Sequence, residues 1–487
     1  MERIAEAVLA DGRKIPYVIT DDPPRGGMKY TYFAPDKSYV VQFFNDREAA
    51  QDMNIRQRLE AIIGKYNPTR SESEGGAPGN SKAMAEYFSR SFCWPTDIVR
   101  TPEFGIVCPA YPSNFFFTEE ASAVLPLKGK DKRSKWFTSP RNRKYLAQEE
   151  IGDFRSMLRM SITLARDVRR MHQAGLAHSD LSCNNVLIDP KSGGCVVIDI
   201  DSLVVPGLFP PEVVGTHGYI APEVLETIGQ PPDKRKLPCA YTDLHALAVL
   251  LYEYLLMRHP LEGPKVYSRS SPEEDDFLAF GPKATFIENP HDTSNRPNDL
   301  ELTIKDMGPV LEDLFLRAFV DGLHNPNLRP TAMEWERGLL KTWDLLHPCA
   351  NPDCAARWFI LHDPKRPVCP YCGVRAKEIL RLRLKSPLRG RSGQWMPAGE
   401  VNVYDNMPLF KWHMLADVFP DEKADRNLQA YICKCRGEWL LVNYAVQGMT
   451  SPGGNLVPIG RAVQLQNGVV FRAAGGERAY LIEPAYF

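Results

Sequence analysis

The chain has 487 residues, a length that favours two to four domains over a single core. Its 59 basic and 60 acidic residues leave a formal net charge of -1, so the whole chain gives no electrostatic reason to bind nucleic acid or a membrane. The N-terminal sequence lacks a signal-peptide core, and the longest apolar run, LHALAVLLYEYLL, is too short to span a bilayer. We therefore expect a cytoplasmic protein whose 11 cysteines do not form disulfides.

The first elements alternate between strands and a helix. Residues 28–44 read as two β-strands around an Asp-containing turn, and a helical stretch over residues 45–63 ends at Gly64. Residues 98–117 again have the pattern of strands. The basic stretch KGKDKRSKWFTSPRNRK, residues 128–144, is expected to be a solvated surface loop rather than a docking patch.

The later elements are first helical and then β-rich. From Ile151 apolar residues recur with the period of a helix, which leads into the stretch HSDLSCNNVLID at residues 178–189. Beyond Ala240 the pattern is mostly helical up to about Leu346. Residues 395–487 consist of short β-type runs separated by Gly, Asn and Pro, which indicates an all-β module.

The stretch HSDLSCNNVLID resembles the catalytic loop of protein kinases. His178, Asp180 and Asn185 have the spacing of that loop, and Asp199 in VVIDID occupies the place of the metal-binding Asp that follows it. Phosphoryl transfer needs a carboxylate that orients the attacking hydroxyl and ligands for the metal ions. The resemblance implies that Asp180 is the base, and that Asn185 and Asp199 bind Mg²⁺ or Mn²⁺ beside ATP.

Three further motifs follow in the order that protein kinases have. GTHGYIAPEV, residues 215–224, matches the end of an activation segment, and YTDLHALAVLLYE, residues 241–253, matches the buried helix with a structural Asp, here Asp243. The resemblance implies that Arg329 in LRPTAMEW pairs with Glu223. This order of motifs is far more specific than any one motif alone, and the region resembles the large lobe of a protein kinase.

The lysine that binds the nucleotide phosphates is displaced. The run VVQF, residues 40–43, matches the strand that normally ends in this lysine, but here it ends in Phe43. The pair Gly26 and Gly27 is followed closely by Lys29, and the with-no-lysine kinases have a similar arrangement. We predict that Gly26 and Gly27 approach the nucleotide and that Lys29 binds its phosphates; the alternative is a solvated strand lysine.

Several positions differ from the usual kinase pattern or are less certain. Glu60 fits the helix carboxylate that should hold Lys29, although it could instead face solvent. Ser179 and Ser182 replace the usual Arg and Lys of the loop. Asp201 stands where glycine is usual, and it could hold a second metal ion or cap a turn.

Four cysteines have the spacing of a structural zinc site. Cys349 and Cys354 form a C-x4-C pair, and Cys369 and Cys372 form a C-x2-C pair followed by Gly373. Two paired thiolate knuckles satisfy tetrahedral Zn²⁺, and four protein ligands leave no open position for catalysis. The sequence therefore predicts a zinc ribbon with structural Zn²⁺.

The C-terminal stretch resembles part of a forkhead-associated domain. WLLVN at residues 439–443 and IGRAVQLQNGVVF at residues 459–471 are similar to the later strands of that family. The Arg and Ser that bind phosphothreonine there cannot be assigned, and a plain β-sandwich used for docking is the alternative.

We therefore predict an α+β two-lobed protein-kinase-like fold, a zinc ribbon and a C-terminal all-β, forkhead-associated-like module. The predicted kinase-like domain covers residues 1–345, with a small lobe of about 1–112 and a large lobe of about 113–345. The zinc ribbon covers residues 346–376 and the β-module residues 390–487.

The whole set of motifs resembles bacterial kinases encoded near tellurite-resistance genes with a von Willebrand A-domain protein and a metal-dependent phosphatase. The resemblance implies that the A-domain protein is substrate or partner and that the phosphatase is the opposing enzyme. Thr216 in GTHGY resembles the Thr that accompanies serine/threonine specificity. We predict an ATP- and Mg-dependent protein kinase, and keep a nucleotide-binding pseudokinase scaffold as the alternative. GTHGYIAPEV argues against a third reading, phosphotransfer to a small molecule.

Overall fold

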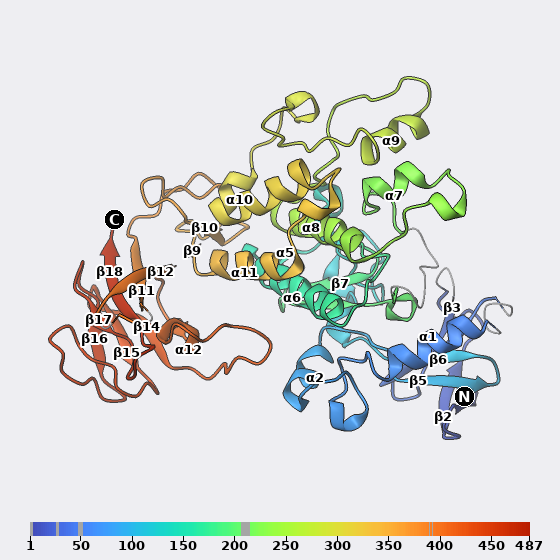
Figure 1. The fold of residues 1–487 in the computed structure, drawn as a ribbon, viewed down its shortest axis with the longest axis horizontal. Coiled ribbons are helices and arrows are strands. Elements are labelled where there is room, and N and C mark those ends of the chain that lie inside the picture. Colours follow the sequence, from blue (N-terminus) through green and yellow to red (C-terminus); the bar gives the residue numbers. More distant parts are fainter. Residues whose placement is uncertain (1–2, 26–28, 47–51, 206–214, 389, 392) are drawn as a thin grey trace. The chain divides into compact units, whose positions relative to one another are not determined.

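The chain divides into two units, which are described separately. The computed structural model describes all residues except 1–2, 26–28, 47–51, 206–214, 389 and 392 (Figure 1). Unit 1 comprises residues 1–152, 159–300 and 314–336, and unit 2 comprises residues 153–158, 301–313 and 337–487. Within the described part, no helix is both long enough and apolar enough to cross a membrane.

An antiparallel six-stranded sheet forms the N-terminal part of unit 1 (Figure 1). Its strand order is β2-β1-β5-β6-β4-β3, and a separate hairpin, β7–β8, follows later in the chain. The strands expected at residues 28–44 are present, those expected at 98–117 end at Pro109, and the hairpin β1–β2 was not anticipated. The strands are β1 Arg3–Leu9, β2 Lys14–Ile19, β3 Lys29–Phe33, β4 Tyr39–Phe44, β5 Asp97–Thr101, β6 Gly105–Pro109, β7 Val186–Asp189 and β8 Gly194–Val197.

The helices lie mostly after residue 150, as their apolar periodicity indicated, and α6, α10 and α11 each have residues in both units. The helix predicted from Ile151 begins at Phe154, and the region beyond Ala240 is largely helical with long connections. The helices are α1 Met53–Ile63, α2 Lys82–Phe88, α3 Lys135–Thr138, α4 Pro140–Arg143, α5 Gln148–Ile151, α6 Phe154–Gln173, α7 Pro222–Thr227, α8 Ala240–Leu256, α9 Pro272–Phe280, α10 Pro309–Leu316 and α11 Ala332–Trp343.

Strand β4 contributes to two cores because successive side chains of a strand point to opposite faces of the sheet. Val41 and Phe43 pack on one face, in the cluster that contains Tyr17 of the hairpin β1–β2. Val40 and Phe44 pack on the other face, in a cluster with residues of α1, β7 and β8. This second cluster joins the sheet to the hairpin that follows the 178–185 loop.

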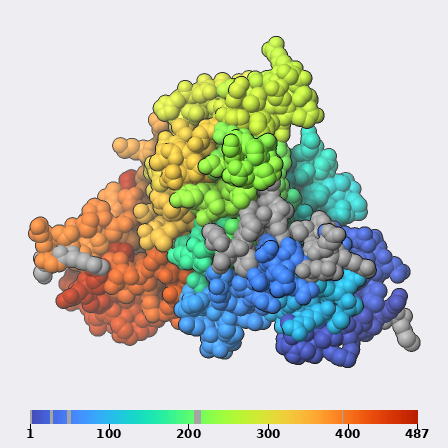
Figure 2. Space-filling view, turned by 45° about the vertical axis from the view of Figure 1, so that its right-hand side comes forward, coloured from blue at the N-terminus to red at the C-terminus, as the bar shows by residue number. Residues whose placement is uncertain are grey.

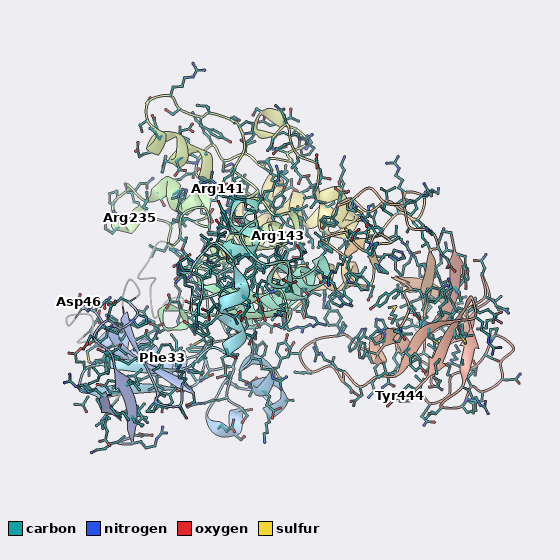
Figure 3. All side chains as sticks on the ribbon, turned by 180° about the vertical axis from the view of Figure 1, so that it is seen from behind. Phe33, Asp46, Arg141, Arg143, Arg235 and Tyr444 are labelled. Carbon is teal, nitrogen blue, oxygen red and sulfur yellow. The ribbon has the colours of Figure 1, made fainter. Side chains whose placement is uncertain are left out.

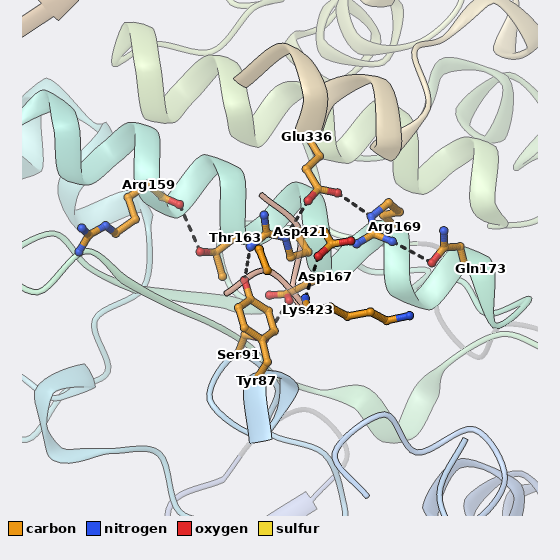
Figure 4. A network of polar contacts seen from close by, with 12 residues as sticks. Tyr87, Ser91, Arg159, Thr163, Asp167, Arg169, Gln173, Glu336, Asp421 and Lys423 are labelled. Atoms are coloured by element: carbon orange, nitrogen blue, oxygen red, sulfur yellow. Dashed lines mark hydrogen bonds and ion pairs between the residues drawn. The ribbon is translucent and has the colours of Figure 1, made fainter. Parts of the chain in front are cut away.

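A buried network of charges holds α6 in place within unit 1 (Figure 4). Glu336 of α11 accepts from Arg166 Nε at 2.7 Å and from Arg169 Nε at 2.6 Å. On the same helix Asp167 accepts from the hydroxyl of Ser91 at 2.8 Å. If α6 moved away from Glu336, buried charges would lose their partners, which is energetically costly. These contacts therefore fix the position of the helix that leads into the 178–185 loop.

In unit 2 two antiparallel four-stranded sheets share one hydrophobic core. Their strand orders are β12-β11-β18-β17 and β13-β14-β15-β16, and side chains of both sheets, such as Leu382 and Ile432, lie in the same cluster. The all-β character expected here is confirmed, and β11 shows that the sheet begins before residue 390. The alternation of leucines with charged residues in LRLRLKSP is itself typical of a strand, and it was the signal available for β11. The strands are β9 Leu346–Pro348, β10 Trp358–Ile360, β11 Leu380–Pro387, β12 Trp395–Asn402, β13 Met407–Leu409, β14 Ala430–Cys435, β15 Glu438–Asn443, β16 Ala462–Gln464, β17 Phe471–Arg472 and β18 Leu481–Tyr486, with helix α12 Lys411–Met414.

Candidate functional site

The 178–185 loop connects α6 to β7, and a buried carboxylate of α8 holds its backbone. Asp243 of α8 accepts from the backbone N–H of His178 at 2.7 Å and from that of Ser179 at 3.1 Å. The ring of His178 is fully buried and contacts the carbonyl of Ile198 at 2.9 Å. The structural role predicted for Asp243 is therefore confirmed, and the loop is tied both to α8 and to the end of β8.

Asp180 is half-buried and held by two neighbouring side chains. The hydroxyl of Thr216 donates to Asp180 Oδ1 at 2.7 Å, and Nδ2 of Asn185 donates to Asp180 Oδ2 at 2.9 Å. The same Nδ2 also donates to the carbonyl of Asp180 at 2.8 Å. Because these bonds use the amide nitrogen of Asn185, its Oδ1 is the atom left to bind a cation.

Asp199 lies beside Asn185 although fourteen positions separate them in the sequence. The backbone N–H of Ile198 donates to the carbonyl of Asn185 at 3.0 Å, which joins the two ends of the β7–β8 hairpin. Asp199 has φ = 60° and a side chain that is 57% exposed, so its carboxylate is accessible to a ligand. An amide oxygen and a carboxylate are oxygen donors of the kind that Mg²⁺ prefers, so these residues fit a divalent cation.

Lys29 is buried among acidic groups at the start of β3. Its ammonium forms an ion pair with Asp201 and lies 3.9 Å from Asp199 Oδ1. Burial alone would lower the pKa of Lys29, but Asp201 and Asp199 more than offset it and hold the pKa above its ordinary value. The alternative of a solvated strand lysine is therefore wrong, and Lys29 is a charged group beside the predicted metal ligand.

The pleat of β4 corrects the position assigned to the missing lysine. Phe43 lies on the face that packs against the β1–β2 hairpin, whereas Phe44 lies on the face with Lys29, whose ammonium is 5.7 Å from its ring centroid. Gln42 shares this second face; its side-chain amide donates to the hydroxyl of Thr31 at 3.2 Å and accepts from the thiol of Cys108 at 3.7 Å. Gln42 rather than Phe43 therefore occupies the position from which the usual strand lysine would reach the nucleotide.

The helix carboxylate expected to hold Lys29 does not do so in this structure. Glu60 is exposed on α1, and the carboxylates that contact Lys29 are Asp201 and Asp199. Asp201 lies in a short 3-10 turn, Ile200–Ser202, and its contact with Lys29 was not among the roles that the sequence offered for it. The predicted Gly26 and Gly27 lie outside the described residues.

The end of the activation-segment motif is anchored as predicted. Arg329 donates to Glu223 through both terminal nitrogens of its guanidinium, at 2.8 and 2.7 Å, and also to the carbonyl of Tyr241 at 2.9 Å. The pairing of Arg329 with Glu223 is therefore confirmed. Ser182, at the place of the usual loop lysine, is fully buried and its hydroxyl accepts from the N–H of Asn184 at 3.3 Å.

The four predicted cysteines lie together in unit 2. Their sulfur atoms all lie within 4.8 Å of one another, with Cys349 and Cys372 at 3.4 Å and Cys354 and Cys369 at 3.9 Å. Thiolates about 2.3 Å from a tetrahedral Zn²⁺ lie about 3.8 Å apart, so the cluster fits that ion. Gly373, with φ = 73°, provides the tight turn after the second pair.

Two thiols of this cluster have pKa values shifted in opposite directions. The backbone N–H of Val374 lowers the pKa of Cys372 to about 7, whereas burial raises the pKa of Cys369 above its ordinary value. A bound cation would have to displace the proton from the buried thiol. Cys433 and Cys435 do not belong to the cluster.

Comparison with known proteins agrees with this geometry. Residues 136–336 match the model of the protein kinase domain. The chain is 33% identical over 135 residues to the anti-Müllerian hormone type-2 receptor of Homo sapiens, covering 23% of each chain. It is 31% identical over 133 residues to the probable serine/threonine-protein kinase RTK1 of Saccharomyces cerevisiae, covering 24% of this chain and 20% of that protein. It is 31% identical over 153 residues to the serine/threonine-protein kinase PknD of Chlamydia felis, covering 26% of this chain and 15% of that protein.

These likenesses support a protein kinase domain of the eukaryotic-like type over residues 136–336. The matched stretches span a quarter or less of the length of these relatives. Beyond residue 336, unit 2 contains a cysteine cluster that fits zinc and two packed β-sheets.

Proposed function

We propose that the chain is an ATP- and Mg-dependent protein kinase that transfers phosphate to serine or threonine of a partner protein. The observation that carries the proposal is that Thr216 and Asn185 hold Asp180, while a second predicted site carboxylate, Asp199, lies 3.9 Å from the buried ammonium of Lys29. Transfer depends mainly on positioning and charge stabilisation, and these groups supply both.

Each group has a distinct part in this proposal. Asp180 accepts the proton of the attacking hydroxyl through the carboxylate that Thr216 and Asn185 orient. Asn185 and Asp199 would hold Mg²⁺, which neutralises charge on the nucleotide phosphates. Lys29 would bind the phosphates in place of the missing strand lysine. The kinases of serine and threonine among the relatives support the acceptor type.

The second candidate is a nucleotide-binding pseudokinase scaffold. The ion pair between Lys29 and Asp201 favours it, because the lysine is already engaged by a carboxylate of the chain. The burial of Ser182 at the place of a usual loop cation also favours it. Both features predict slow transfer, and the retained Asp180, Asn185 and Asp199 support the enzyme.

The partner and the role of unit 2 are part of the same proposal. The likeness of the motifs to the bacterial kinase group supports a von Willebrand A-domain protein as substrate, a metal-dependent phosphatase as opposing enzyme and a link to tellurite resistance. We propose that the zinc ribbon at Cys349–Cys372 and the β-sheets, similar in part to forkhead-associated domains, recruit that substrate. The proposed location is the cytoplasm.

The test measures transfer of labelled terminal phosphate from Mg-ATP to the chain itself and to the A-domain protein. Wild type is compared with Lys29→Met, Asp180→Asn and a matched control, Lys14→Met, whose side chain is 65% exposed on β2. Binding of Mg-ATP to each variant is measured separately by thermal shift. We expect transfer by wild type and Lys14→Met, and loss of at least tenfold in the other two variants.

Each of the other possible results would change a specific part of the proposed function. Transfer that survives Lys29→Met would place the phosphate clamp elsewhere. Transfer that survives Asp180→Asn would remove the base from its assigned role. Binding of Mg-ATP by wild type without any transfer would select the scaffold.

A further inference from the structure

The basic segment at residues 128–144 is packed against the 178–185 loop and the strand that follows it. Lys132, Ser134 and Phe137 are buried, and the N–H of Ile188 donates to the carbonyl of Lys132 at 2.9 Å. The next residue, Arg133, forms a backbone β-bridge with Leu187. The expectation of a solvated loop is therefore wrong, because apolar and backbone contacts fix the segment on β7.

Part of the positive charge of this segment is neutralised inside unit 1. Lys132 pairs with Glu150 at 2.7 Å and with Asp189 at 3.0 Å, and all three side chains are buried. Lys135 pairs with Glu253 at 2.8 Å and remains 44% exposed. These pairs hold the segment in place and do not serve an outside ligand.

Most of the remaining positive charge is exposed, whereas Arg143 is partly buried and donates to the carbonyl of Phe137 at 3.2 Å. Figure 3 labels Arg141 and Arg143 of helix α4, and Figure 2 shows the cyan-to-teal surface of this part of the chain open to solvent. Asp131 is the one acidic residue between positions 128 and 144. Exposed basic residues of the segment are Lys128, Lys130, Arg133, Arg141 and Lys144, of which Lys128 pairs with the exposed Glu119.

Arg133 brings this charge to the edge of the 178–185 loop. Its side chain is 48% exposed, and its guanidinium lies 3.4 Å from Oδ1 of Asn184, the neighbour of the predicted metal ligand Asn185. Asn184 is neutral and leaves the charge of Arg133 in place, while the carboxylate of Asp131, whose side chain is 29% exposed, lies 4.0 Å away, at the outer limit of an ion pair. A cation therefore stands beside the loop that carries Asp180.

We infer that the protein substrate carries acidic side chains close to its acceptor hydroxyl, and that Arg133 recognises them. This inference rests on the proposed function, because it takes the acceptor to lie at Asp180. The guanidinium is suited to this task because its fork of donors matches a carboxylate.

The exposed charges further along the segment strengthen the attraction. Lys130, Arg141 and Lys144 share one sign of charge, and fields of one sign raise the local concentration of an oppositely charged ligand. A peptide is favoured over a nucleic acid because the chain as a whole has a net charge of -1 and the exposed patch is confined to one segment.

The test uses three peptides that share one serine acceptor. The residues that flank the serine are Asp and Glu in the acidic peptide, Ala and Gln in the neutral peptide, and Lys and Arg in the basic peptide. The full chain is compared with Arg133→Glu and with Arg100→Glu, a matched charge reversal at an exposed position of β5. Transfer from Mg-ATP gives the ratio of kcat/KM for the acidic peptide to that for the neutral one, and fluorescence anisotropy gives peptide binding without any chemistry. We expect wild type and Arg100→Glu to prefer the acidic peptide by roughly fivefold, and Arg133→Glu to lose or reverse that preference.

The outcomes separate this inference from the proposed function. Acid-selective binding that depends on Arg133, without transfer, would refute the kinase and keep the recognition of acidic peptides. Equal use of the three peptides by wild type, or equal losses in both charge reversals, would overturn the inference while transfer itself stands. Tighter binding of a single-stranded oligonucleotide than of the acidic peptide would also overturn it.

Discussion

Lys29 forms a buried ion pair with Asp201, although 172 positions separate them in the chain. Two departures from the usual kinase pattern meet in this contact: a lysine supplied from β3 and a carboxylate in place of a glycine. The carboxylate keeps the buried ammonium charged, as the raised pKa of Lys29 indicates. Nucleotide phosphates would have to compete with Asp201 for the same cation.

The first prediction follows from that competition. In Asp201→Asn the ammonium of Lys29 loses its main partner, so the nucleotide-free protein should become less stable, by about 3 kcal/mol for a buried pair. Mg-ATP should then bind about tenfold more tightly, because its phosphates replace the missing charge. The measurements are chemical unfolding without nucleotide and titration with Mg-ATP.

The control for this variant is Asp36→Asn, at an exposed position in the turn between β3 and β4. It should alter neither stability nor affinity. Weaker binding of Mg-ATP to Asp201→Asn would contradict the prediction and would instead indicate that Asp201 holds a metal ion.

The second prediction compares two ion pairs of different burial. Arg329 is 1% exposed and binds Glu223 with both terminal nitrogens of its guanidinium, whereas Arg317 and Glu334 are 34% and 41% exposed. Arg329→Lys should lower the free energy of unfolding by about 3–5 kcal/mol, because lysine cannot replace the fork and leaves buried partners unsatisfied. Arg317→Lys should lower it by less than about 1 kcal/mol. Urea unfolding followed by circular dichroism measures both, and similar losses in the two variants would contradict the assignment.

The third prediction concerns the cysteine cluster. Purified protein should contain one equivalent of zinc, and Cys369→Ser should abolish it because four thiolates complete the tetrahedral site. Cys433→Ser, outside the cluster, should retain the metal. Metal analysis gives the content, and hydrogen exchange after chelation should rise in residues 349–373 while unit 1 stays protected. Zinc retained at full occupancy in Cys369→Ser would refute the site.

The fourth prediction is a loss of stability in acid. Burial lowers the pKa of His259 to about 4, and its ring is bonded to the carbonyl of Gly218 and to the N–H of Leu261. The unfolded chain takes up a proton near pH 6.5, before the folded protein does, so stability is complete above that pH and falls between about 6.5 and 4. The loss from this group is about 3 kcal/mol at most. The free energy of unfolding, measured between pH 7 and 4, should fall less steeply with pH for His259→Gln than for wild type. Equal slopes would show that His259 does not cause the loss of stability.

The motifs of the site could be identified from the sequence because their chemistry requires particular residue types a few positions apart in the chain. Asp180 and Asn185 are close along the chain, and one amide group of Asn185 bonds to Asp180 in the fold. The pairing of Arg329 with Glu223 and the gathering of four cysteines also followed from motifs whose order carries information.

Other features depended on which surfaces meet and could not be predicted. The alternation of β4 was visible in the sequence, but only its packing against α1 and β7 showed that Phe43 lies on the opposite face from Lys29. The exposed position of Glu60 likewise depends on how α1 rotates against the sheet.

The sequence by itself therefore determined the class of domain, the candidate base and metal ligands, and the cysteine site, because each is encoded in local spacing. The tertiary structure alone decided that Lys29 meets Asp201 and that Arg133 lies beside Asn184. The physical reason is that a buried charge must pair with whichever opposite charge lies beside it in the folded protein. Contacts between segments that are distant in the sequence leave no periodic pattern from which that partner could be predicted.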